Sequence, residues 1–119
     1  MGLKKSAVVG LVALGLLVPA SARRDARADD VPEKMLLDND KVLVMEVVFP
    51  AGFKGDEHEV PVDEFAYVLD GEFSVVTKGK GKSVVKKGQV EWAPKGAVHY
   101  SLNETRGPAR VLVVFLKER

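Results

Sequence analysis

Two histidines and one glutamate are the residues of this chain whose types and spacing could form a chemical site. His58 and His99 are its only histidines, and Glu64 follows the first of them by six positions. Because side chains alternate across a strand, Asp56, His58 and Val60 share one face if residues 56–60 are extended. If the faces that carry His58, Glu64 and His99 look into one barrel, the two imidazoles and the carboxylate converge in an otherwise apolar bowl.

Such a set of donors is suited to a divalent metal. Two neutral imidazoles and one carboxylate, with coordination positions left open, suit non-haem iron(II), and manganese, nickel, zinc and copper are alternatives. One carboxylate leaves a divalent centre with a net charge of about +1, which favours an anionic substrate oxygen. A metal held there would act as a Lewis acid or activate a bound water. The sequence therefore predicts binding of a metal and of a small, oxygen-rich or anionic molecule.

Two other functions fit the same residues. In the first, His58, Glu64 and His99 hydrogen-bond a small polar ligand without a metal. In the second, the barrel is only a scaffold for structural or protein-interaction purposes. No separate nucleophile or additional acid–base pair is visible beyond Asp56 and Tyr100. The sequence therefore leaves open whether the protein is an enzyme.

The elements that must position these residues are short strands. Runs rich in β-branched residues and bounded by glycine, proline and aspartate predict strands and turns, and no stretch shows sustained helical periodicity. Besides the extended segment 56–60, strands are expected at 42–49, 65–69, 72–77, 83–86, 89–93, 98–102 and 109–116. Seven or eight short strands of this kind indicate an all-β sandwich or small barrel. Strands 42–49 and 109–116 are apolar on both faces, which predicts that a second layer or a second subunit covers them.

Two stretches of the chain resemble the paired motifs of the cupin superfamily. The glycines, histidine and glutamate of the first motif match at Gly52, His58, Glu64 and Gly71. The second motif matches at Gly88, Pro94, Gly96, His99 and Asn103. The resemblance covers residues 40–117 and implies a double-stranded β-helix, or jelly-roll, cupin barrel. The four motif glycines lie at predicted turns and are expected to have positive φ.

The chain departs from the cupin pattern at one position, where the second histidine of the first motif is Val60. Members of the family usually place three histidines and one glutamate around a metal. The resemblance therefore implies His58, Glu64 and His99 as metal ligands, with one nitrogen ligand missing and Asp56 as a candidate replacement. If the protein is an enzyme, the resemblance implies a metal-dependent oxidoreductase, isomerase or decarboxylase.

The first residues have the pattern of a secretory signal peptide. Lys4 and Lys5 precede an apolar run at 7–18, and small residues at 20–22 provide a cleavage site after Ala22. A second site of the same type would allow cleavage after Ala28. This pattern predicts an exported protein, periplasmic or secreted, without stable membrane insertion after cleavage. The expected organisation is a signal peptide at 1–22, a flexible lead-in at 23–40 and a cupin domain at 41–117.

Composition and net charge limit the classes of partner that are expected for this protein. The 119 residues carry a formal net charge of +1, which does not favour nucleic acid as a partner, since nucleic-acid-binding domains usually carry a clustered basic face. Cysteine is absent, so neither disulfides nor a lipid-modified cysteine is available to an exported form. The lysines of segment 78–82 are expected to keep an exposed hairpin tip soluble. A small-molecule ligand is the predicted partner, and a homodimer is an option that the apolar strands allow.

Overall fold

The computed structural model describes residues 31–118, and this part of the chain is built from β-strands alone. It contains no helix long and apolar enough to cross a membrane. The nine strands are β1 (Glu33–Asp38), β2 (Val42–Phe49), β3 (His58–Glu59), β4 (Glu64–Asp70), β5 (Glu72–Thr77), β6 (Gly81–Lys86), β7 (Val90–Ala93), β8 (Val98–Leu102) and β9 (Ala109–Leu116). The predicted all-β fold is confirmed.

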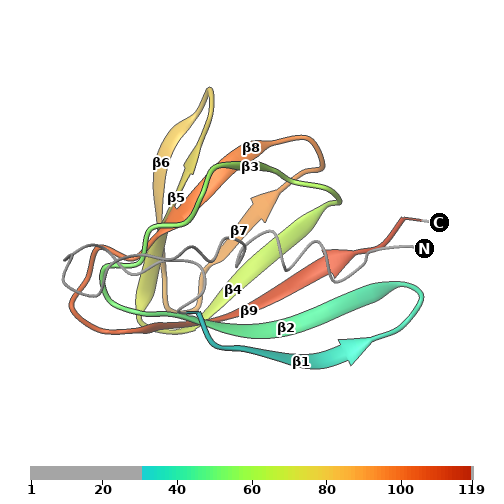
Figure 1. Ribbon diagram of the computed structural model, residues 1–119, viewed down its shortest axis with the longest axis horizontal. Helices are drawn as coiled ribbons and strands as arrows, with labels where there is room; N and C mark the ends of the chain where they lie inside the picture. Colours follow the sequence, from blue (N-terminus) through green and yellow to red (C-terminus); the bar gives the residue numbers. More distant parts are fainter. Residues whose placement is uncertain (1–30, 119) are drawn as a thin grey trace, which may run out of the picture.

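The strands form two antiparallel sheets (Figure 1). One sheet has the order β1-β2-β9-β4-β7, and the other has the order β3-β8-β5-β6. Apart from the β1–β2 and β5–β6 hairpins, the chain changes sheet at every connection from one strand to the next. This winding is that of a jelly roll, or double-stranded β-helix, and it places the two motif stretches on both sheets.

Burial of alternate side chains explains why β2 and β9 lie at the centre of their sheet. The buried residues of β2 are Leu43, Met45, Val47 and Phe49, and they lie opposite Phe115, Val113, Val111 and Ala109 of β9. Each large side chain of this kind stabilises the fold by roughly 1.5–3 kcal/mol when fully buried. The other face of both strands is only half-buried. The inward row therefore forms much of the core between the two sheets.

Strand β1 was not anticipated by the sequence pattern, which predicted a flexible lead-in at residues 23–40. A register irregularity between Met35 and Leu37 interrupts the pairing of β1 with β2, and both residues are about half exposed. Because the strand neither alternates nor buries its apolar side chains, the periodicity that identifies strands is missing. It is an edge strand held mainly by its pairing with β2.

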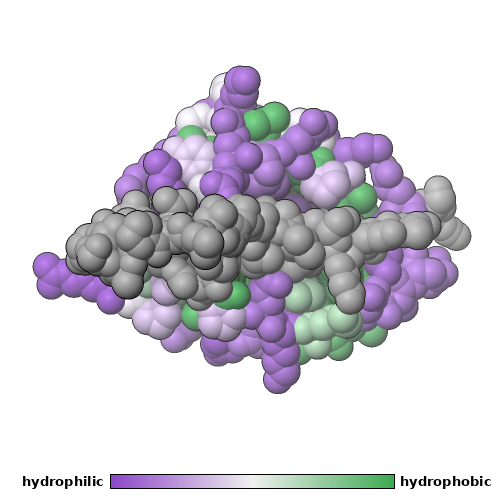
Figure 2. All heavy atoms as spheres, in the orientation of Figure 1, coloured by the Kyte–Doolittle hydropathy of each residue, from purple (hydrophilic) through white to green (hydrophobic). Residues whose placement is uncertain are grey.

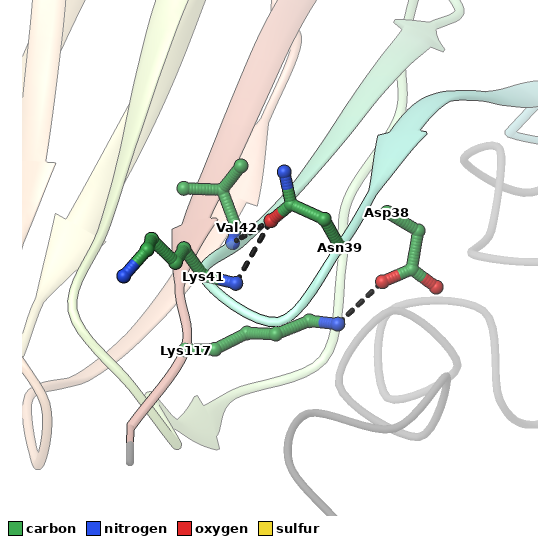
Figure 3. A network of polar contacts seen from close by, with 5 residues as sticks. All are labelled: Asp38, Asn39, Lys41, Val42 and Lys117. Carbon is green, nitrogen blue, oxygen red and sulfur yellow. Dashed lines mark hydrogen bonds and ion pairs between the residues drawn. The ribbon is translucent and has the colours of Figure 1, made fainter.

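A polar network fixes the turn between β1 and β2 (Figure 3). Asn39 Oδ1 accepts hydrogen bonds from the backbone N–H groups of Lys41 and Val42, at 2.8 and 2.9 Å. Lys117, just after β9, pairs through Nζ with Asp38 Oδ1, and its backbone N–H donates to the carbonyl of Lys41 at 2.8 Å. The end of the last strand is thereby tied to the first hairpin.

Asn103, which occupies the last position of the second motif, has a structural role. It is fully buried, and its Nδ2 donates to the carbonyls of Phe49 and Gly107, both at 2.9 Å. Its Oδ1 accepts from the N–H of Thr105 at 2.9 Å and from the Thr105 hydroxyl at 2.7 Å. One amide therefore joins the end of β2 to the loop that precedes β9.

We expect Asn103→Ala to lower the free energy of unfolding by about 3 kcal/mol, because it leaves several buried polar groups without partners. Urea denaturation at pH 7 measures this cost. The matched control is Asn39→Ala, which removes hydrogen bonds of the same kind from an exposed turn and should cost less than about 1 kcal/mol. Equal costs at the two positions would contradict the structural role of Asn103.

Candidate functional site

The two histidines face each other across neighbouring strands. His58 of β3 lies directly opposite His99 of β8 in the antiparallel register. Their ring centroids are 4.8 Å apart and the ring planes meet at 75°. His99 is only 4% exposed, whereas His58 is half-buried. The structure thus brings together two imidazoles that are 41 positions apart in the sequence.

Glu64 reaches the same place from the other sheet. It begins β4, and its Oε2 lies 3.9 Å from Nε2 of His99, with 15% of the Glu64 side chain exposed. Burial, and secondarily the carboxylate of Glu91, raises the pKa of Glu64 to about 8. Burial, and secondarily His58, lowers the pKa of His99 to about 4. At neutral pH both groups are therefore mostly uncharged, and their contact is not an ion pair.

A backbone carbonyl orients the His58 ring. His58 Nδ1 lies 3.0 Å from the main-chain oxygen of Asp56. A carbonyl oxygen only accepts, so Nδ1 carries the proton in this hydrogen bond and the neutral ring keeps its lone pair on Nε2. This is the arrangement that metal-binding histidines commonly adopt. On His99, Nδ1 is buried and has no hydrogen-bond partner among the described residues.

The candidate replacement ligand, Asp56, lies outside this cluster. The Asp56 side chain is exposed, and only its main-chain carbonyl touches His58. Val60 is fully buried, and its N–H and C=O bond to Ala97 and Gly96 at 2.7 and 2.8 Å. Within residues 31–118, no three His, Cys, Asp or Glu side chains are grouped closely enough, as they stand, to hold a metal ion. Metal binding by His58, Glu64 and His99 thus requires their side chains to close further around the ion.

Glu91 is a member of the site that sequence reasoning missed. It lies on β7 opposite Ala66 of β4. In the register, the Ala66–Glu91 pair is the next pair on the same face of the sheet after the Glu64–Ala93 pair. Burial raises the pKa of Glu91, and nearby Lys80 opposes that rise. Alternation in the predicted strand 89–93 groups Glu91 with Ala93, but it does not say which of the two faces is inward. The low exposure of Ala93, at 2%, settles that question in the structure.

A groove opens beside the cluster, between the β5–β6 hairpin and β7. Its cavity volume is about 760 Å³, within the range of small-molecule sites. Thr77, Lys80, Ser83, Glu91, Trp92 and Ala93 are among its lining residues. Trp92 is 52% exposed and lines this groove. We refer to it below as the hairpin groove.

Solved structures of low sequence identity share this fold. A cupin domain from Bordetella pertussis Tohama I is 20% identical, covers 82% of this chain and 100% of its own, and gives a TM-score of 0.64. A double-stranded β-helix protein from Methanocaldococcus jannaschii is 17% identical over 86% of this chain and 93% of its own, with a TM-score of 0.67. The DMSP lyase DddQ from Ruegeria pomeroyi DSS-3 is 22% identical over 72% of this chain and 46% of its own, with a TM-score of 0.67.

The sequence itself matches a family. No curated protein matches the chain. The sequence profile of the cupin domain matches residues 45–115, which include both motif histidines and all strands from β3 to β8. This match covers more than half of the chain and agrees with the observed jelly-roll winding. The chain therefore belongs to the cupin family.

Proposed function

We propose that this cupin binds a divalent transition metal through His58, Glu64 and His99 and presents it to a small, oxygen-rich or anionic molecule. The observation that carries the proposal is the direct opposition of the two imidazoles, with a carboxylate oxygen 3.9 Å from one of them. Two nitrogen donors and one oxygen donor suit iron(II), manganese, nickel, zinc or copper. A bound metal would supply Lewis-acid chemistry at the open positions.

The donors fit this role in their protonation as well as in their type. His99 is neutral at physiological pH, and the hydrogen bond of His58 to the Asp56 carbonyl directs its lone pair to Nε2. Glu64 would have to release its proton to a cation, which would also relieve the cost of burying its charge. With Val60 at the position of a fourth ligand, more coordination positions stay open to water or ligand oxygen than in the usual family site.

Zinc titration of the full chain by calorimetry tests the proposal. We expect one equivalent to bind, and we expect His58→Ala and His99→Ala each to weaken the affinity at least about 100-fold, because each removes one of three ligands. Glu59→Gln is the control, since this neighbouring side chain in β3 is exposed. Zinc binding that persists unchanged in both histidine variants would refute the assignment.

A metal-free binding module is the second candidate. It is favoured by the lack of a preformed group of three metal-binding side chains within residues 31–118 and by the protonated state of Glu64 at neutral pH. A neutral carboxyl group and two imidazoles both donate and accept hydrogen bonds, so they can bind a polar ligand directly. In that case ligands would raise the melting temperature while zinc would not.

Catalysis, export and homodimer formation stay predictions. If the protein is an enzyme, the metal would act as a Lewis acid or activate a bound water. The proposed signal peptide and its cleavage sites lie outside the described residues. The domain boundaries proposed from the sequence likewise stay predictions, although strand β1 lies inside the expected lead-in.

A further inference from the structure

The hairpin groove exists because two edge strands do not meet. β6 ends the four-stranded sheet and β7 ends the five-stranded sheet, so no backbone ladder closes the barrel between them. The β5–β6 hairpin also projects away from the body of the molecule, at the top of Figure 1. The result is an opening about 760 Å³ in volume, lined by residues of the hairpin and of β7.

Two residues that line the groove pair directly with members of the histidine–glutamate cluster. Thr77, at the end of β5, lies directly opposite His99 in the sheet register. Ala93, at the end of β7, lies directly opposite Glu64. Both Thr77 and Ala93 line the groove. A molecule bound against Thr77 and Ala93 would therefore contact the strands next to those that carry His99 and Glu64.

The charges at the groove suit an anion that also carries hydrogen-bond donors. Lys78, Lys80 and Glu91 all line it, and the two lysines are exposed whereas Glu91 is half-buried. Lys80 is near enough to oppose the rise in the pKa of Glu91, yet the two are not among the ion pairs formed by residues 31–118. Lys82 of the same hairpin differs, because it pairs with Glu104 and does not line the groove.

The rest of the lining combines hydroxyl groups with exposed apolar surface. Thr77 and Ser83 provide side-chain hydroxyls, and Gln89 provides an amide. Val84, Val90 and Trp92 also line the groove and are each about half exposed. In Figure 2, hydrophobic and hydrophilic atoms lie side by side over the projecting hairpin. A ligand with several hydroxyl groups, an apolar ring face and one negative charge matches this mixture.

We propose that the hairpin groove binds a sugar acid, with its carboxylate at Lys80 and its hydroxyl groups toward Thr77, Ser83 and Glu91. This inference rests on the proposed function, since it names the class of molecule that the histidine–glutamate centre receives. The carboxylate gains a charge-assisted partner at the rim, and Glu91 accepts hydrogen bonds from hydroxyl donors. The ring would reach the centre through the space between Thr77 and Ala93.

Fluorescence of Trp92 reports on the groove directly, because it is the only tryptophan of the chain. The full chain is titrated with D-glucuronate, with D-glucose, which lacks the carboxylate, and with acetate, which lacks the hydroxyl groups. Calorimetry on the same samples gives the affinities. The variants are Lys80→Gln and the matched control Lys82→Gln, both at exposed positions of one hairpin. Urea denaturation confirms that each variant is folded.

We expect D-glucuronate to bind at least tenfold more tightly than either D-glucose or acetate. Lys80→Gln should remove this preference, and Lys82→Gln should keep it. Equal binding of glucuronate and glucose, equal binding of glucuronate and acetate, no glucuronate binding, or equal losses in the two lysine variants would each overturn the inference.

The glucuronate and zinc experiments can fail independently of each other. Zinc binding that depends on His58 and His99, without a glucuronate signal, refutes the ligand class and leaves the metal site standing. A Lys80-dependent glucuronate signal without zinc binding supports the groove and moves the function to the metal-free module.

Discussion

The apparent affinity of the protein for zinc is expected to rise about 50-fold between pH 6 and pH 8, more steeply in the first pH unit than in the second. The reason is the proton on Glu64, whose pKa is raised to about 8 by burial and by Glu91. The fraction of deprotonated carboxyl groups falls about fivefold in the first pH unit below that pKa and about tenfold in the next, and only the deprotonated form is a good metal ligand. His99, with its pKa near 4, stays neutral over this range and adds no slope of its own.

Competition with a chelator of known pH-dependent affinity measures this slope. Glu64→Gln removes the titrating carboxyl group. The zinc affinity of this variant should therefore be weaker than that of the wild type at pH 8, and it should change little between pH 6 and pH 8. Glu59→Gln should keep the wild-type slope, since this carboxyl group is exposed and lies outside the cluster. A wild-type affinity that is flat from pH 6 to pH 8, or a slope that survives in Glu64→Gln, would show that Glu64 does not bind the metal.

Gly71→Ala is expected to be the most damaging single-methyl change, with a loss of about 4 kcal/mol of unfolding free energy. Gly71 joins β4 to β5 with φ of +78°, a conformation that costs L-residues roughly 1–2 kcal/mol. An added Cβ would also lie 2.4 Å from the carbonyl oxygen of Pro108 and 3.0 Å from Cα of Ala109. Both atoms belong to the backbone at the start of β9, so they cannot move aside without disturbing a central strand.

Gly88→Ala separates the two contributions. Gly88 has a similar φ of +83°, but an added Cβ there would meet no atom within 4 Å. Its expected cost is about 1 kcal/mol, from backbone strain alone. Urea denaturation of both variants at pH 7 gives the comparison. Because small domains are stable by only about 5–15 kcal/mol, the Gly71 variant should unfold at a clearly lower urea concentration. Equal midpoints would show that the contact with Pro108 is relaxed at little cost.

Local patterns were sufficient to predict most of the scaffold. Strands 42–49, 72–77, 98–102 and 109–116 have the predicted bounds, and the four motif glycines have the predicted positive φ. These features depend on neighbours in the sequence, since β-branched alternation defines a buried strand and glycine relieves strain at a turn. The spacing of the two motifs likewise identified the family and the three residues that come together.

Only the tertiary structure decided which of these residues touch and what surrounds them. The opposition of His58 and His99, the inward position of Glu91 and the burial of Val60 all depend on how two sheets pack and in which register. The same holds for the protonation of Glu64, because desolvation is a property of the assembled core and not of a residue type. Strand β1 forms through its pairing with β2 at the edge of a sheet. The hairpin groove forms because the sheet edges β6 and β7 do not pair with each other. Alternation in the sequence divides the side chains of a strand between two faces. Which of the two faces is buried depends on how strands that are distant in the sequence pack together.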